Sequence, residues 1–152
     1  FEGFKMILIA HRGNISGKQE ARENTVSYIN EALTKGFDVE IDLWSHGGFL
    51  YLGHDKPTEI IDPVYLNNPS LWCHAKNLDA LVQLRRLNTT GGYNIHYFWH
   101  QKDDVTLTSK NYIWAFPGKQ PIKDSIAVMP EVGGDVLTGC QGICSDFIQK
   151  YK

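Results

Sequence analysis

MILIAHRG, residues 6–13, is the most informative stretch of the 152-residue chain. Its first five residues are apolar at every position, which is typical of a parallel strand covered on both faces. His11, Arg12 and Gly13 follow directly, so the pattern places two basic side chains at the C-terminal end of this strand. Ligands and catalytic groups gather at that end of parallel sheets. The stretch therefore predicts a parallel α/β sheet with a functional site at one end.

Two carboxylates lie in the clearest strand of the sequence, residues 37–43, where apolar and acidic residues alternate strictly. Glu40 and Asp42 are two positions apart, so their side chains point to the same face and can converge on one hard cation. A turn at Gly47-Gly48 returns the chain as a hairpin arm that ends at His54-Asp55. Acidic and basic side chains are thus predicted to meet near two strand ends.

Helical and strand patterns alternate along the first 90 residues. A helix is expected from a cap at Asn24 or Thr25 to Gly36, and a second from Asn77 to just before Gly91, with an apolar face of Leu78, Leu81, Val82 and Leu84. Further strands are expected over 71–76, 95–99, 112–116, 126–129 and 143–145, with short connections in the second half. This order predicts a compact (β/α)8 barrel that lacks several outer helices, although a doubly wound sheet also fits.

Bulk composition sets limits on partners and location. The net charge of −2 gives no reason to expect nucleic acid, and no apolar run is long enough for a membrane span. We expect one domain over residues 1–152, reduced cysteines and a cytoplasmic setting, since no signal peptide is evident. A barrel without its outer helices would leave the backs of strands exposed, and self-association could cover them.

Four motifs together resemble a known enzyme family. His11-Arg12-Gly13, Glu23-Asn24, Glu40-x-Asp42 and His54-Asp55 occur in the order seen in glycerophosphodiester phosphodiesterases, within the phospholipase C-like barrel phosphodiesterases of lipid metabolism. Cys140–Asp146 resembles the last barrel strand of that family. The resemblance implies that His11 and His54 transfer protons, that Arg12 binds phosphate oxygens, and that Glu40 and Asp42 hold calcium or magnesium. These roles suit imidazole, guanidinium and carboxylate chemistry.

One position departs from the family pattern. The family carries a Glu-x-Lys pair on the next strand, where this chain has His74-Ala75-Lys76. Lys76 matches and is expected to contact the phosphate. His74 would replace a carboxylate ligand by a softer nitrogen, which makes manganese or zinc more plausible than calcium.

Other side chains are assigned supporting or substrate-lining roles. Glu23 and Asn24 are expected to support the site, as is Asp55 beside His54. His96 and His100 share a strand face, but only His100 would reach the mouth of the site. Trp114 could line a substrate pocket.

The predicted activity is metal-assisted hydrolysis of a glycerophosphodiester or a similar small phosphodiester. A neighbouring substrate hydroxyl would attack phosphorus with help from one histidine, and the other would protonate the leaving alcohol. Water would then open the cyclic product, or the cyclic product would leave as in a lyase. A catalytically weakened module that binds a phosphate or phosphodiester is the alternative from another class.

Overall fold

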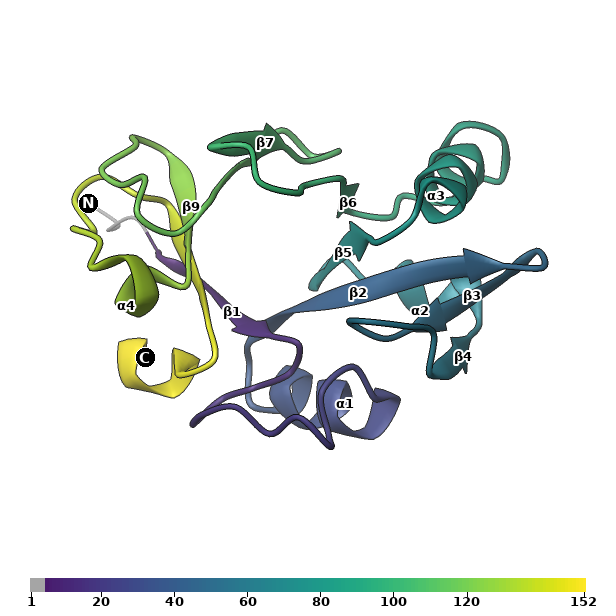
Figure 1. Ribbon diagram of the computed structural model, residues 1–152, viewed down its shortest axis with the longest axis horizontal. Coiled ribbons are helices and arrows are strands. Elements are labelled where there is room, and N and C mark those ends of the chain that lie inside the picture. The colour runs from purple at the N-terminus through teal and green to yellow at the C-terminus, as the bar shows by residue number, and fades with distance from the viewer. Residues whose placement is uncertain (1–4) are drawn as a thin grey trace.

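A computed structural model describes residues 5–152, and β1 (Ile7–His11) lies in the middle of its ten-stranded sheet. Seven strands run parallel in the order β6-β5-β2-β1-β10-β9-β8. Their bounds are β2 (Asp38–His46), β5 (Leu71–Ala75), β6 (Tyr97–Phe98), β8 (Ile113–Ala115), β9 (Ser125–Val128) and β10 (Gly142–Ser145). Three strands pair antiparallel at the margins, namely β3 (Phe49–Leu52), β4 (Glu59–Ile61) and β7 (Val105–Leu107). Figure 1 shows that the sheet curls.

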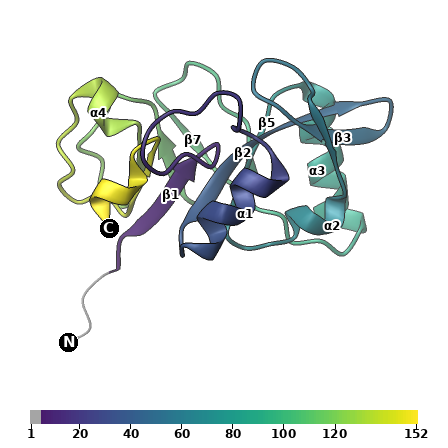
Figure 2. The same ribbon diagram turned by 90° about the horizontal axis from the view of Figure 1, so that it is seen from below.

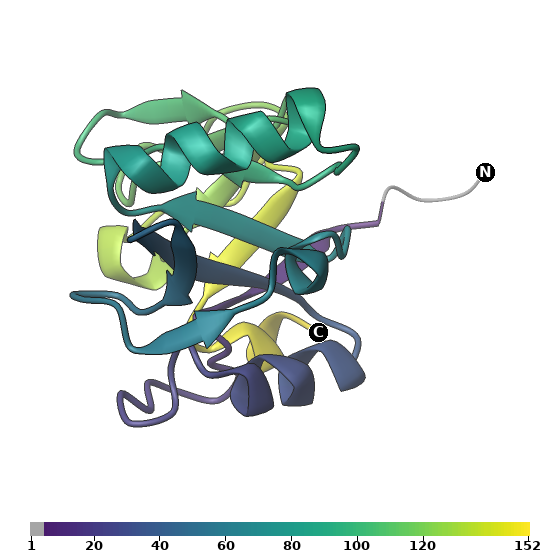
Figure 3. The ribbon, with the colours of Figure 1, turned by 90° about the vertical axis from the view of Figure 1, so that its right-hand side faces the viewer.

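Two longer helices cover the outside of this curl. α1 (Val26–Thr34) begins at Thr25, whose hydroxyl accepts a hydrogen bond from the Tyr28 amide. α3 (Leu78–Thr90) begins at Asn77, whose side chain accepts from the Ala80 amide. Figure 2 shows α1 in front of β2, and Figure 3 shows α1 below the strands and α3 above them. The remaining helices are single turns: α2 (Pro63–Leu66), α4 (Pro130–Gly133) and the 3-10 helix η1 (Ile148–Tyr151).

The expected (β/α)8 barrel is wrong. Over the described residues the sheet mixes parallel and antiparallel pairs, and only four α-helices form. No strand ladder joins β6 to β7 or β8 in residues 5–152; isolated bonds, such as Ser109 N–H to the Tyr97 carbonyl at 2.8 Å, bridge that side. The connections after α3 are too short to hold full crossover helices. The result is a curled half-barrel, and the doubly wound alternative fails for the same lack of helices.

Side chains inside the curl follow the two-residue period of the strands. An apolar cluster fills the part of the curl that lies before the C-terminal strand ends. It consists of Ile9, Trp72, Phe98, Trp114, Ile126, Val128 and Cys144. Two positions further along four of these strands the chain carries polar side chains instead, namely His11, His74, His100 and Asp146. Because alternate residues point to the same face, the strands that bury the apolar cluster also aim these polar groups at one end of the curl.

The predicted apolar face of α3 is partly wrong. Leu78 is 66% exposed and Val82 45% exposed, whereas Ala80 and Leu84 are fully buried. Ala80, Leu84 and Leu87 are four and three positions apart, so they form the stripe that packs on the sheet. Leu78 and Val82 follow the same spacing but on the outer side of the helix.

Two expectations about composition can be compared with the structure. All three cysteines are buried and unbridged, as the prediction of reduced thiols requires. Among residues 5–152, no helix is both long and apolar enough to span a bilayer.

His96 supplies a prediction of acid sensitivity. Burial against Trp72, with ring centroids 4.1 Å apart, lowers the pKa of His96 to about 4. The unfolded chain therefore binds a proton that the folded chain does not, and stability present above about pH 6.5 is lost as the pH falls toward 4. The shift corresponds to about 3 kcal/mol. Urea unfolding at pH 7 and pH 4.5 should show this loss in wild type and a much smaller one in His96→Gln; equal losses would contradict the assignment.

Candidate active site

Strand register brings the predicted site residues together. His11 pairs with Glu40 between β1 and β2, and Asp42 pairs with His74 between β2 and β5. Glu40 and Asp42 are 2% and 1% exposed, so both carboxylates are almost fully removed from water. Their positions are consistent with the prediction, made from the two-residue period of a strand, that both side chains point to the same face of the sheet.

His11 is held by a carboxylate from the neighbouring strand end. Its Nδ1 lies 2.7 Å from Asp146 Oδ1, and its Nε2 lies 3.9 Å from Glu40 Oε1. Burial alone would lower the pKa of His11, but the hydrogen bond to Asp146 and the charge of Glu40 raise it above its ordinary value. In return, His11 keeps the pKa of Asp146 below its usual range despite burial. Because Asp146 accepts a hydrogen bond from Nδ1 of His11, Nε2 is the His11 nitrogen that faces the site.

Arg12 and His54 face one another across the site. Arg12 Nη2 lies 3.1 Å from His54 Nε2, and His54 Nδ1 lies 3.3 Å from Asp42 Oδ2. A guanidinium can only donate, so His54 accepts at Nε2 and donates its Nδ1 hydrogen to Asp42. Arg12 itself has a φ of 57°, a left-handed conformation that is uncommon outside glycine and is concentrated at functional sites.

Three side chains form a group that fits a divalent cation. Ligand atoms of Glu40, Asp42 and His74 all lie within 4.8 Å of one another. Two atoms bound to one ion at about 2.0–2.6 Å can be at most about 5.2 Å apart, so a shared ion is geometrically feasible. Glu40 Oε1 is buried and has no hydrogen-bond partner in the described part of the chain. A buried carboxylate oxygen without a partner is costly unless a cation or a hydrogen-bond donor such as water occupies the space beside it, and a cation also offsets its charge.

His74 is oriented as metal-bound histidines are. Its Nε2 donates to the His100 carbonyl at 2.8 Å, which leaves Nδ1 facing Asp42 Oδ1 at 3.4 Å and Glu40 Oε2 at 3.6 Å. A hydrogen bond from the second ring nitrogen to a backbone carbonyl is the usual support of a histidine ligand. Burial disfavours the charged ring, but the two carboxylates raise the pKa of His74 to about 9. Hydrogen bonds from His54 and His74, with the charges of His74 and Arg12, hold the pKa of Asp42 well below its usual range, against the effect of its burial.

The predicted supporting pair is in place, with a partner that the sequence did not indicate. Glu23 Oε1 lies 3.3 Å from Arg12, and Asn24 donates to Asp42 Oδ2 at 3.0 Å. The additional residue is Asn14, which is fully buried and donates to both Glu23 and Asp146. The Asn14 amide therefore links Glu23, which contacts Arg12, to Asp146, which contacts His11.

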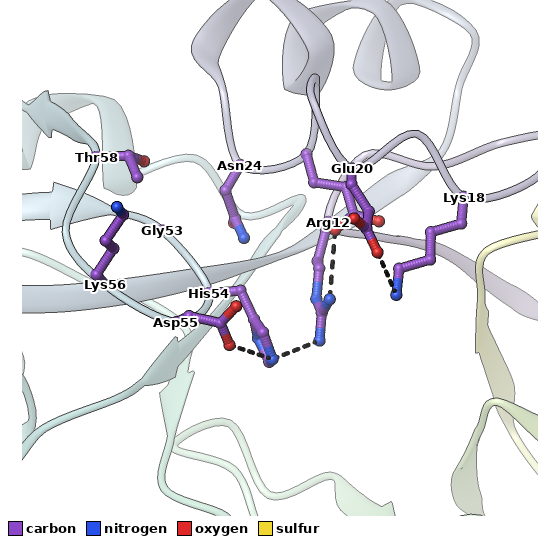
Figure 4. A pocket seen from close by; sticks show the side chains of 10 residues that line it. Arg12, Lys18, Glu20, Asn24, Gly53, His54, Asp55, Lys56 and Thr58 are labelled. Carbon is purple, nitrogen blue, oxygen red and sulfur yellow. Dashed lines mark hydrogen bonds and ion pairs between the residues drawn. The ribbon is translucent and has the colours of Figure 1, made fainter.

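Two adjoining spaces flank the site. A small cavity of about 130 Å³ is lined by the candidate metal ligands and also by Lys76, His100 and Trp114. An open cleft of about 490 Å³ lies on the other side of Arg12 and His54 (Figure 4). Asp55 lines this cleft, with its side chain 92% exposed and one oxygen 3.5 Å from His54 Nε2.

Asn14 was not predicted at the site, and the sequence indicated Asp146 only as a minor candidate. Asp146 directly follows β10, and β10 lies beside β1 in the sheet. The same strand-end rule that selected His11 applies to it, but only the β1–β10 pairing makes them neighbours. Asn14 carries no comparable signal, since a loop asparagine near a glycine is an ordinary turn residue.

Gly53 positions His54, and its replacement gives a stability prediction. Gly53 has a φ of 150°, and a Cβ there would lie 1.9 Å from the Lys56 carbonyl oxygen. Gly53→Ala is expected to destabilise the fold by about 2–4 kcal/mol and to displace His54. Gly47→Ala is the matched control, because Gly47 has a φ of 58° but nothing within 4 Å of its Cβ position, so its cost should be about 1 kcal/mol. Chemical denaturation measures both, and equal effects would contradict the steric argument.

No protein-family model matches this chain, and neither the curated proteins nor the solved structures contain a significant match.

Proposed function

We propose that this chain is a metal-assisted phosphodiesterase that acts on a glycerophosphodiester or a similar small phosphodiester. One observation carries the proposal: the buried, unpartnered Glu40 oxygen belongs to a three-residue ligand group that stands between two histidines, each paired with a carboxylate. In an ion-pair network with a purely structural role, buried oxygens are normally paired with a neighbouring side chain, the backbone or ordered water. The resemblance of four ordered motifs to glycerophosphodiester phosphodiesterases supports the same chemistry.

Glu40, Asp42 and His74 would hold the cation. When bound, a divalent cation neutralises charge that develops on the phosphoryl oxygens. The nitrogen ligand at His74 favours manganese or zinc, while the two carboxylates also accept magnesium or calcium. Arg12 and Lys76 would bind the remaining phosphate oxygens, since both line the small cavity beside the ligand group.

The two histidines would move the protons. One removes the proton of a neighbouring hydroxyl on the substrate, whose oxygen then forms a bond to phosphorus. As the bond from phosphorus to the leaving oxygen breaks, the other histidine donates a proton to that oxygen. Asp146 and Asp42 stabilise whichever imidazole becomes charged, because each lies within hydrogen-bond distance of its ring. Water then opens the cyclic phosphate in a hydrolase, or the cyclic product leaves in a lyase.

A phosphodiester-binding module without turnover is the second candidate. The raised pKa of His74, about 9, means that a protonated imidazole can balance Glu40 and Asp42 at neutral pH in place of a metal ion. A site neutralised in this way would still attract a phosphate through Arg12 and Lys76. Self-association through exposed strand backs also stays a prediction, and the mass from solution scattering would test it.

Turnover of a generic diester separates the two candidates. Bis(p-nitrophenyl) phosphate lacks a neighbouring hydroxyl, so glycerophospho-p-nitrophenol is the better probe, with magnesium, calcium, manganese or zinc added in turn. Wild type should release nitrophenol with at least one metal, and His54→Ala should be slower by about 10²-fold or more. Wild type that binds the diester but releases nothing with any metal would favour the binding module.

A further inference from the structure

The open cleft beside Arg12 and His54 is distinct from the small cavity that contains the ligand group. Both spaces share Arg12 and His54, so a phosphorus atom bound between these side chains would have one ester arm in each space. The small cavity, about 130 Å³, has room only for a compact arm. The cleft, about 490 Å³ and open to solvent, suits the larger arm, which is also the one that must depart.

Charges along the cleft are balanced. Its three cations are Arg12, Lys18 and Lys56, and its three carboxylates are Glu20, Glu23 and Asp55. Lys18 lies 3.2 Å from Glu20, and Arg12 lies 3.3 Å from Glu23. Two of the three cations are therefore paired with a carboxylate of the same cleft. Figure 4 shows Lys18 and Glu20 on one side of the cleft and Asp55 and Lys56 on the other. A ligand with a net charge of either sign gains little from such a surface.

The lining also lacks the groups that recognise apolar ligands and quaternary ammonium groups. None of the described residues that line the cleft is Phe, Tyr or Trp, and none is aliphatic. A quaternary ammonium group would find no cage of Trp, Tyr or Phe rings, and an alkyl chain would find no apolar surface to bury. The lining instead offers both donors and acceptors, from Asn24, Thr58 and the charged side chains. Hydroxyl groups both donate and accept, so they match this mixture.

We infer that the cleft binds the leaving alcohol, and that this alcohol is uncharged and polyhydroxylated. The inference rests on the proposed phosphodiesterase function and adds the chemical class of the departing group. In that reaction the bond from phosphorus to the polyol oxygen breaks, and the polyol leaves through the open side with the proton that a histidine supplies.

Leaving-group preference tests the inference. We would compare kcat/KM for four glycerophosphate esters, those of inositol, choline, dodecanol and p-nitrophenol, with the metal that gives the highest rate. Wild type should prefer the inositol ester over the choline and dodecyl esters by about tenfold or more. Lys56→Met should reduce the ratio of kcat/KM for the inositol ester to that for the nitrophenyl ester by about three- to tenfold, because a hydrogen-bond donor to the polyol is lost.

Lys123→Met, an exposed lysine outside the cleft, is the matched control and should leave this ratio unchanged. Equal rates for the inositol, choline and dodecyl esters, or a ratio that Lys56→Met does not change, would overturn the inference while leaving the phosphodiesterase function intact. Failure to turn over any of the four esters would overturn the proposed function, and the inference with it.

Discussion

His11→Ala is expected to lower kcat for glycerophosphodiester cleavage by about 10³-fold, within the 10²–10⁴ range typical of a lost general acid or base. His11 Nε2 is aimed into the small cavity because Nδ1 is bonded to Asp146 at 2.7 Å. An alanine leaves no group within reach that could move the same proton. KM should change much less than kcat, since Arg12 and Lys76 would still bind the phosphate.

His46→Ala is the control for this variant. His46 ends β2 and is exposed, away from both spaces of the site, so its removal should leave kcat within a factor of two. Asp146→Asn should fall between the two, because an amide can still contact His11 but no longer stabilises its protonated form. Steady-state kinetics measures all three. An unchanged kcat in His11→Ala would remove His11 from the mechanism.

Glu40→Gln is expected to weaken metal binding by about 10²-fold or more and to reduce turnover in parallel. The substitution removes the negative charge of the carboxylate whose Oε1 is buried without a partner, and the amide offers only one weaker oxygen ligand. Excess metal should restore part of the activity, which distinguishes lost metal affinity from general disruption. Isothermal titration with manganese measures the binding.

Asp38→Asn is the matched control on the same strand and the same face. Asp38 accepts a hydrogen bond from the Trp72 indole at 2.9 Å and lies outside the ligand group, so manganese affinity should be unchanged. Equal losses of affinity in Glu40→Gln and Asp38→Asn would show that the carboxylates act through stability and not as ligands.

The first half of the fold could be predicted because its patterns are local. Strict alternation over residues 37–43 predicted β2, and a cap at Asn24 or Thr25 and one at Asn77 predicted where α1 and α3 begin. The predicted barrel was wrong because closure of a barrel depends on the connections between its strands. After α3 the chain is too short to hold a helix between each pair of strands, and β7 fills part of that space by pairing antiparallel with β8.

The candidate site could be predicted more fully than the fold. Period-2 alternation and strand ends place His11, Glu40, Asp42 and His74 without knowledge of the sheet order. Asp146 needed the pairing of β1 with β10, across more than 130 residues of chain, which no local pattern contains. The two-residue period predicts which side chains of a strand point inward, but it does not predict which other strand lies beside it.

Phosphodiesterase activity can be followed by phosphorus-31 NMR of glycerophosphoinositol incubated with wild type and manganese. The diester signal should decay and be replaced by a cyclic phosphate or a phosphomonoester signal, while His11→Ala should leave the diester signal intact. A diester signal that persists with folded wild type in manganese, zinc, magnesium and calcium would show that the chain is not a phosphodiesterase for this substrate.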